Sequence, residues 1–111
     1  MWAGDGDDVA ALAFARRHWA DAERMSDERV LEVLEAAQPT VVEYAPVLAL
    51  DAPVPLEYQL AHVYHAREVA SAAGMGAGDV VPGGEYAIRP RPLTGAVKQL
   101  LRPQRAVPGL G

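Results

Sequence analysis

The positions of the nine prolines place the strongest limits on how this 111-residue chain can fold. Proline has no backbone N–H, and its ring clashes with the preceding helical turn, so a helix interior rarely holds one. Only Pro39 lies among the first 45 residues, whereas three prolines fall within residues 46–55 and four within residues 88–111. Helices can therefore form before and after a connector at 46–55, and the C-terminal stretch favours extended backbone.

Two helices are expected before the connector. Asp7 or Asp8 can cap a helix that runs to about Ala22, and Ser26 can cap a second one. Apolar residues recur at helical spacing in both segments. The first stripe is Val9, Leu12, Ala15 and Trp19, and the second is Val30, Val33, Leu34, Ala37, Val41 and Tyr44. Because the second stripe stays in register across Pro39, we expect that helix to continue there with a kink.

A third helix is expected from Leu56 to Ala73, with Gly74 as its C-terminal stop. One face carries the apolar positions that should contact the other helices: Leu56, Leu60, Val63, Ala66 or Arg67, and Ala70. A neighbouring face carries a second stripe: Tyr58, His62, His65 and Val69. We interpret this second stripe as an amphipathic interface with a neighbouring subunit.

The core that these helices can form is thin. Half of the chain is hydrophobic, but Ala supplies 21 residues, Val 13 and Leu 11, against one Phe and two Trp. We therefore expect neighbouring subunits to cover apolar surface that one chain leaves open. Charge is also divided along the chain, because residues 1–87 hold all 15 acidic side chains and residues 88–111 hold five basic ones and no acid. The net charge of −5 argues against a general nucleic-acid binder.

These patterns predict a mainly α fold, a small helical bundle of three longer helices and one short C-terminal helix, with an extended Pro-rich basic C-terminal arm. Thr94 can cap the short helix. The expected organisation along the chain is a disordered N-terminus at 1–6, a helical body at 7–73, a Gly-rich loop at 74–85, and an arm at 86–111 with its short helix at about 95–101.

Few residues could support catalysis. The chain has no cysteine, which excludes disulfides and Cys-type zinc sites. His62 and His65 lie three residues apart, with Glu68 three further on, but two histidines alone do not make a zinc site, and packing is the favoured interpretation. The acids of the second helix lie along one face and are expected to be solvated: Glu28, Glu32 and Glu35. The glycine-rich loop follows a helix and has no nearby Lys, unlike a phosphate loop. We expect no catalytic residue, no metal, no cofactor and no enzyme.

The most informative stretch is Ile88–Gly109, which reads IRPRPLTGAVKQLLRPQRAVPG. It resembles the C-terminal end of the head-to-tail connector (adaptor) proteins of long-tailed actinobacterial phages. In that family an extended I-R-P-x-P-apolar piece precedes a V-K-x-L-L-R-P segment. The third helix, with its pattern of Val63, Ala66 and Arg67, and the helix before it resemble the same family, so the likeness covers residues 26–108. The family often has an aromatic residue where this chain has Gly95.

The resemblance implies a structural component of the virion neck, assembled in the cytoplasm of the bacterial host. Such connectors form a ring, dodecameric by resemblance, that binds the portal protein above and the next connector, stopper or tail-terminator protein below. Double-stranded DNA would pass through the ring without sequence-specific binding, and no membrane is involved. An acidic ring wall would repel DNA and let it slide. The arm residues implied to bind the portal or a neighbouring subunit are Tyr86, Ile88, Arg89, Pro90, Pro92, Leu93, Val97, Lys98, Leu100, Leu101, Arg102, Pro103 and Arg105.

Two other functions stay open on the sequence. A small helical bacterial regulatory protein would bind a protein partner, or DNA through its basic arm, although the acidic second helix and the single Arg67 of the third do not suit a DNA-reading helix. A small metalloenzyme would need His62 and His65 to hold its metal. Salt-dependent binding of duplex DNA and a metal assay on the purified chain separate these two functions from a connector.

Overall fold

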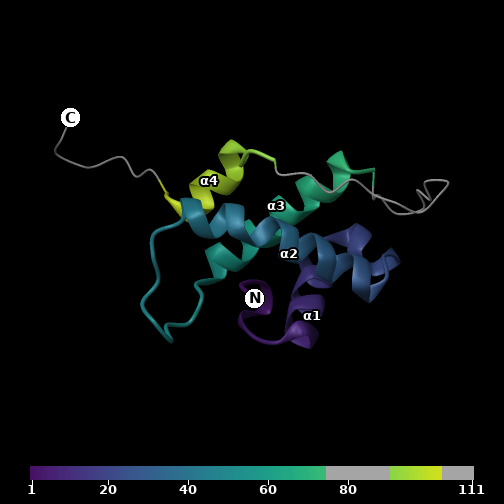
Figure 1. Ribbon diagram of the computed structural model, residues 1–111, viewed down its shortest axis with the longest axis horizontal. Helices are drawn as coiled ribbons and strands as arrows, with labels where there is room; N and C mark the ends of the chain where they lie inside the picture. Colours follow the sequence, from purple (N-terminus) through teal and green to yellow (C-terminus); the bar gives the residue numbers. More distant parts are fainter. Residues whose placement is uncertain (75–90, 104–111) are drawn as a thin grey trace.

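The structure is a computed structural model, and it describes residues 1–74 and 91–103. Within these residues two short 3-10 helices and four α-helices follow one another, and neither range contains a strand. The mainly α bundle predicted from the sequence is confirmed, with three longer helices and a short fourth one (Figure 1). The elements are η1 (Ala3–Asp5), α1 (Asp8–His18), η2 (Ala20–Arg24), α2 (Asp27–Tyr44), α3 (Leu56–Ala72) and α4 (Gly95–Leu101).

The helix at the centre of the bundle is α3, which contacts α1, α2, α4 and η1. In Figure 1, α2 crosses over α3, and α1 and α4 lie on opposite sides of that crossing. Because three of the buried residues of α3 are alanines, its neighbours can approach closely. A helix with partners on several sides keeps no free apolar stripe. The buried residues of α3 are Ala61, His62, Val63, His65, Ala66, Val69 and Ala70.

The first helix is shorter than the sequence predicts, and its buried face is shifted. The prediction that it runs to about Ala22 is wrong, because α1 ends at His18 and Trp19 adopts extended backbone with φ −140° and ψ 99°. Val9 was expected in the core but is 74% exposed. The N-terminal segment, whose Ala3 is fully buried, occupies the space beside α3 at this end of the bundle.

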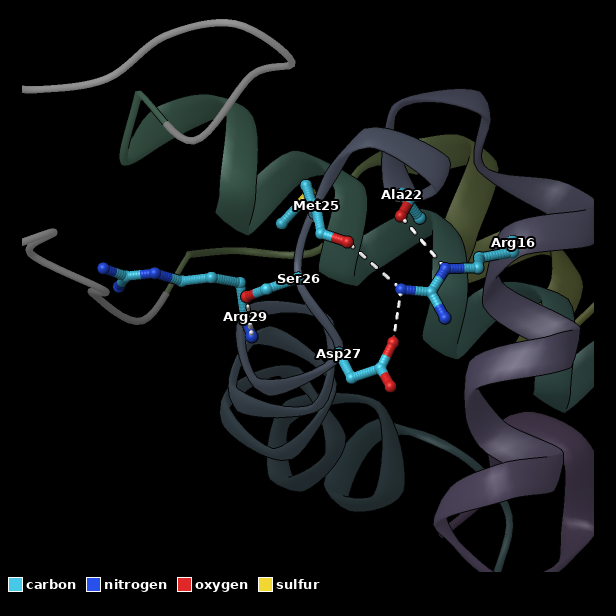
Figure 2. Close-up of polar contacts among 6 residues, drawn as sticks. All are labelled: Arg16, Ala22, Met25, Ser26, Asp27 and Arg29. Carbon is cyan, nitrogen blue, oxygen red and sulfur yellow. Dashed lines mark hydrogen bonds and ion pairs between the residues drawn. The ribbon is translucent and has the colours of Figure 1, made fainter.

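A side chain of α1 fastens the reversal that follows it. The Nε of Arg16 donates to the Ala22 carbonyl oxygen at 3.2 Å, and its Nη2 donates to the Met25 carbonyl oxygen at 3.1 Å. The same Nη2 lies 2.7 Å from Asp27 Oδ1, which joins α1 to the first turn of α2 (Figure 2). Ser26 caps α2 as predicted, since its hydroxyl oxygen accepts a backbone N–H of that turn at 3.2 Å.

The N-terminal segment, residues 1–6, is ordered, so the prediction that it is disordered is wrong. Gly4 has φ +77°, and a Cβ added there would lie 2.4 Å from the Ala10 carbonyl oxygen, so this position needs glycine. The physical reason for the order is a set of hydrogen bonds that apolar periodicity does not reveal. Three consecutive backbone N–H groups donate to side chains of α2 and α3: Trp2 to Gln38 Oε1 (2.8 Å), Ala3 to His62 Nδ1 (3.0 Å) and Gly4 to Gln59 Oε1 (3.1 Å).

The second and third helices span the predicted ranges, but Leu56, the first residue of α3 and expected on its contact face, is 57% exposed. α2 continues past Pro39 to Tyr44, as the unbroken apolar stripe predicted. The predicted connecting segment follows as a loop at 45–55, called the 45–55 loop below, and α3 then begins directly after Pro55. Gly74 has φ +76° and provides the expected stop after α3.

The helix α4 begins where the sequence predicted and packs on its own chain. The hydroxyl of Thr94 accepts the Val97 N–H at 3.3 Å, which is the expected cap. Val97 and Leu101 are buried in a cluster whose other buried members come from α2, its C-cap and α3: Val41, Ala45 and Ala61. The part of the arm at 91–103 is therefore not a free extended strap, because its short helix has an apolar face that the chain's own body covers.

Candidate partner-binding surface

The stripe interpreted as a subunit interface packs inside the chain. His62 and His65 are fully buried, and Val69 is 3% exposed. Tyr58 is half-buried, and the centroid of its ring lies 5.3 Å from that of Trp2 in the N-terminal segment. The assignment of these four residues to a subunit interface is corrected accordingly. The reason is that α3 is surrounded by other elements of the same chain, which cover the histidines and Val69 of this stripe.

The His62 ring joins three parts of the molecule. Its Nδ1 accepts the Ala3 N–H at 3.0 Å, and its Nε2–H donates to the Leu34 carbonyl oxygen at 2.7 Å. This pair of bonds requires the neutral ring with its proton on Nε2. Burial lowers the pKa of His62 from 6.5 to about 4, against the opposing effect of the hydrogen bond to Leu34. Since the Nδ1 lone pair is already engaged, the ring is not free to ligate a metal or to act as a base on a substrate.

The neighbouring His65 is also buried, and its environment differs. Neither ring nitrogen has a hydrogen-bond partner among the described residues. Burial is the main cause that lowers the pKa of His65, with Glu68 opposing the change and Arg91 adding to it. Within residues 1–74 and 91–103, no group of three His, Asp or Glu side chains lies close enough to hold a metal ion. The geometry therefore gives the metalloenzyme hypothesis no support.

The arm residues that the structure describes divide into an inner and an outer set. Val97 and Leu101 are buried, and Leu93 and Leu100 pack half-buried against the same cluster. The prolines that flank this segment, Pro92 and Pro103, are exposed. Five residues of the predicted arm site lie outside the described residues: Tyr86, Ile88, Arg89, Pro90 and Arg105. These four aliphatic residues of the predicted arm site thus pack on the chain that carries them.

The outer face of α4 is cationic. Lys98 and Arg102 are exposed and lie over the ring of Tyr44, at 5.7 Å and 5.5 Å from its centroid. Arg102 is also fixed by its Nε, which donates to the Tyr44 carbonyl oxygen at 2.6 Å. The stacking holds both side chains in place while their charges stay in solvent. The structure thereby presents two positioned positive charges at one end of the bundle.

Two shallow hollows flank this cationic helix, and each combines an acid, a base and a tyrosine. The larger hollow, of about 480 Å³, is lined by Pro46, Glu57, Tyr58, Leu100, Leu101, Arg102 and Pro103. The smaller one, of about 400 Å³, is lined by Thr40, Glu43, Tyr44, Leu93 and Lys98. Hollows of this mixed character suit side chains of a protein partner, because they offer both apolar area and charge pairing.

Sequence reasoning missed the most exposed apolar side chains. Val47 and Leu50, in the 45–55 loop between α2 and α3, are 98% and 93% exposed. The sequence could have indicated this exposure, because both residues lie between Pro46 and Pro53, in a loop of a kind that is usually polar. Exposed apolar residues that project from one loop are typical of contact sites.

Comparisons of the chain with protein-family models, with curated proteins and with solved structures find no match. No helix within the described ranges is long and apolar enough to cross a lipid bilayer. Any assignment of function therefore depends on the residues of this chain and their arrangement.

Proposed function

We propose that this chain is a structural building block, a head-to-tail connector that forms a ring under a phage portal and continues the DNA channel toward the tail. The observation that carries the proposal is the segment Val97–Pro103, whose residues match the V-K-x-L-L-R-P pattern of such connectors. In the fold this segment is a capped surface helix with leucines inward and cations outward. In the proposed connector, this arrangement presents charge to a partner from a helix fixed on the bundle.

The distribution of charge on the surface supports ring formation. The cationic outer face of α4 lies beside the C-terminal end of α2, where Tyr44 is stacked under Lys98 and Arg102. Three exposed acids of α2, Glu28, Glu32 and Glu35, lie in its N-terminal half, away from these cations, and a fourth, Glu43, lies in the same hollow as Lys98. Unlike charges on different parts of one subunit favour a heterologous contact, in which each copy binds the next, and such contacts form a ring when the rotation between copies closes.

The docking of α4 changes how the arm works in this proposal. Leu100 and Leu101 pack on their own chain, so they are not the anchors that enter a partner. The contacts with the portal or with a neighbouring subunit fall instead to the outward side chains Lys98 and Arg102 and to the remainder of the arm. In this proposal α4 fixes the arm on the bundle, and the rest of the arm contacts a partner.

The mass of the assembly tests this proposal directly. Size-exclusion chromatography with light scattering is run on the chain alone and on the chain mixed with the portal ring of the same phage, followed by negative-stain imaging. A ring or a portal complex is expected for the unaltered chain, and Lys98→Glu should weaken it while Arg24→Glu, an exposed cation on η2, should not. A chain that stays monomeric at all concentrations and leaves the portal unbound contradicts the proposal.

The alternative function, a helical regulator that binds DNA through its basic arm, rests on the same two exposed cations of α4. A salt titration with a short DNA duplex separates the two functions. A connector is expected to bind the duplex weakly, because its acidic body repels phosphate. Tight binding that falls steeply with salt would favour the regulator.

A further inference from the structure

The N-terminal segment is fastened to the bundle through backbone hydrogen bonds to three side chains and through apolar contacts of Met1, Trp2 and Ala3. One of the three acceptors, His62 Nδ1, exists only while the imidazole is neutral, whereas Gln38 and Gln59 accept at any pH. We propose that residues 1–6 form a latch that opens in acid, when His62 takes up a proton and can no longer accept the Ala3 N–H. This inference does not depend on the proposed function.

The geometry leaves the protonated ring no way to keep both bonds. In the neutral ring the Nε2–H donates to Leu34 and the Nδ1 lone pair accepts from Ala3. An imidazolium carries a proton on both nitrogens, so Nδ1–H would point at the Ala3 N–H across a separation of 3.0 Å. Turning the ring over does not help, because one donor would still meet another donor in a fully buried place.

The charged groups around His62 reinforce the neutral state. From the N-terminal segment, the Met1 ammonium lowers the pKa of His62, and from α3 the neighbouring His65 lowers it too, both after burial as the largest cause. From α2 only the Leu34 carbonyl faces the ring, and it raises the pKa. The acid of the segment, Asp5, is directed elsewhere, because its Oδ2 accepts the Val54 N–H at 3.2 Å. Among the described residues, no carboxylate is close enough to stabilise an imidazolium inside the closed latch.

The segment can leave without unfolding the bundle. Its helix η1 has three residues, and its other polar and ring contacts are the two glutamine bonds, the ring contact of Trp2 with Tyr58, and the bond from Val54. Ala3 also packs in the main core cluster, but the larger side chains of α2 and α3 in that cluster contact one another and should stay in place. Opening would free the acceptor atoms of Gln38, Gln59 and His62. It would also break the bond from the Val54 N–H to Asp5, which ties the 45–55 loop, with its exposed Val47 and Leu50, to the N-terminal segment.

Amide hydrogen exchange and imidazole nitrogen shifts, followed by NMR from pH 7 downward, test the latch. At pH 7 the His62 ring should carry its proton on Nε2, and the Ala3 and Gly4 amides should be protected. As His62 titrates, those two amides should lose protection with the same midpoint, below pH 6.5, while the amides of α2 and α3 stay protected. Protection at Ala3 that persists after His62 is charged overturns the proposal. Loss of protection only together with the whole fold also overturns it.

Variants separate the latch from general acid sensitivity. Gly4→Ala should open it at every pH, since the added Cβ has no room beside Ala10, whereas Gly95→Ala, which meets nothing within 4 Å, is the matched control. By linkage, an open latch must also raise the pKa of His62 toward 6.5, and each unit regained corresponds to a tenfold change in proton affinity. His62→Asn keeps a neutral acceptor near the Nδ1 position, so its latch should stay closed in acid. A pKa of His62 that Gly4→Ala leaves unchanged would refute the coupling even if His62→Asn fails to fold.

Discussion

Replacing Leu101 with alanine should release α4 from the bundle while α1, α2 and α3 stay folded. Leu101 is 1% exposed and belongs to the cluster that fastens α4 to the ends of α2 and α3. The substitution removes three buried carbons at about 0.8 kcal/mol each and leaves a cavity, so the expected loss is about 2–5 kcal/mol. A helix of seven residues has little stability of its own. After the substitution, Val97 is the one fully buried side chain left on α4. The lost free energy of packing should therefore be enough to undock the helix.

Hydrogen exchange at single residues measures this release. The Lys98 and Arg102 amides bond to carbonyl oxygens of the same helix and its cap, at 3.0 Å and 2.8 Å, so they report whether α4 is formed. A loss of about 2 kcal/mol should speed their exchange about 30-fold or more, while amides of α3 change little. Leu100→Ala is the matched control, since Leu100 is only half-buried in the same cluster. Equal effects of the two leucines, or an equal loss of protection in α3, would refute the view that α4 is a separately docked helix.

Four further outcomes follow from single contacts. Arg16→Gln removes the ion pair with Asp27 and the donor groups for two carbonyl oxygens, so the free energy of unfolding in urea should fall by about 1–3 kcal/mol. Ser26→Ala should cost about 1 kcal/mol through the lost cap, and an unchanged urea midpoint would contradict that role. Gly74→Ala should cost about 1 kcal/mol because its φ is +76°, although the added Cβ meets no atom within 4 Å. Because the folded chain holds His62 neutral down to about pH 4, the unfolded state binds more protons between pH 4 and 6.5, and the free energy of unfolding should rise by about 3 kcal/mol across that range. Urea titrations at several pH values check this rise, and His62→Asn should reduce it to the part contributed by His65, whose pKa burial also lowers.

Local signals in the sequence were sufficient for the helices and most of their ends. Ser26 and Thr94 cap the helices they precede, because a cap depends on residues only three apart along the chain. Gly74 ends α3 for an equally local reason, its positive φ. The early end of α1 was not predictable in this way, because Arg16 reaches carbonyl oxygens and a carboxylate that follow a turn whose shape no local pattern specifies.

The N-terminal segment shows why longer-range structure escaped prediction. Residues 1–6 lie at the chain terminus and hold two glycines, and such a segment is usually frayed. Its order depends on Gln38 and Gln59, which lie 36 and 55 residues away from the N–H groups they accept. A glutamine on a helix carries no mark of such a partner in the sequence. The bonds become visible only once α2 and α3 are packed side by side.

The correction to the histidine stripe also decides where a partner can bind. A helix in a three-helix bundle usually buries one stripe, so a second stripe indicates an interface. Here α4 and the N-terminal segment are additional neighbours of α3, and the histidines and Val69 of the second stripe are buried inside the chain. The two most exposed large apolar side chains are those of the 45–55 loop, Val47 and Leu50, and Pro46 of the same loop lines a hollow together with Arg102. Under the proposed function, a protein partner that binds there would gain apolar burial from the 45–55 loop and charge pairing from Lys98 and Arg102, which is the combination that a specific protein contact requires.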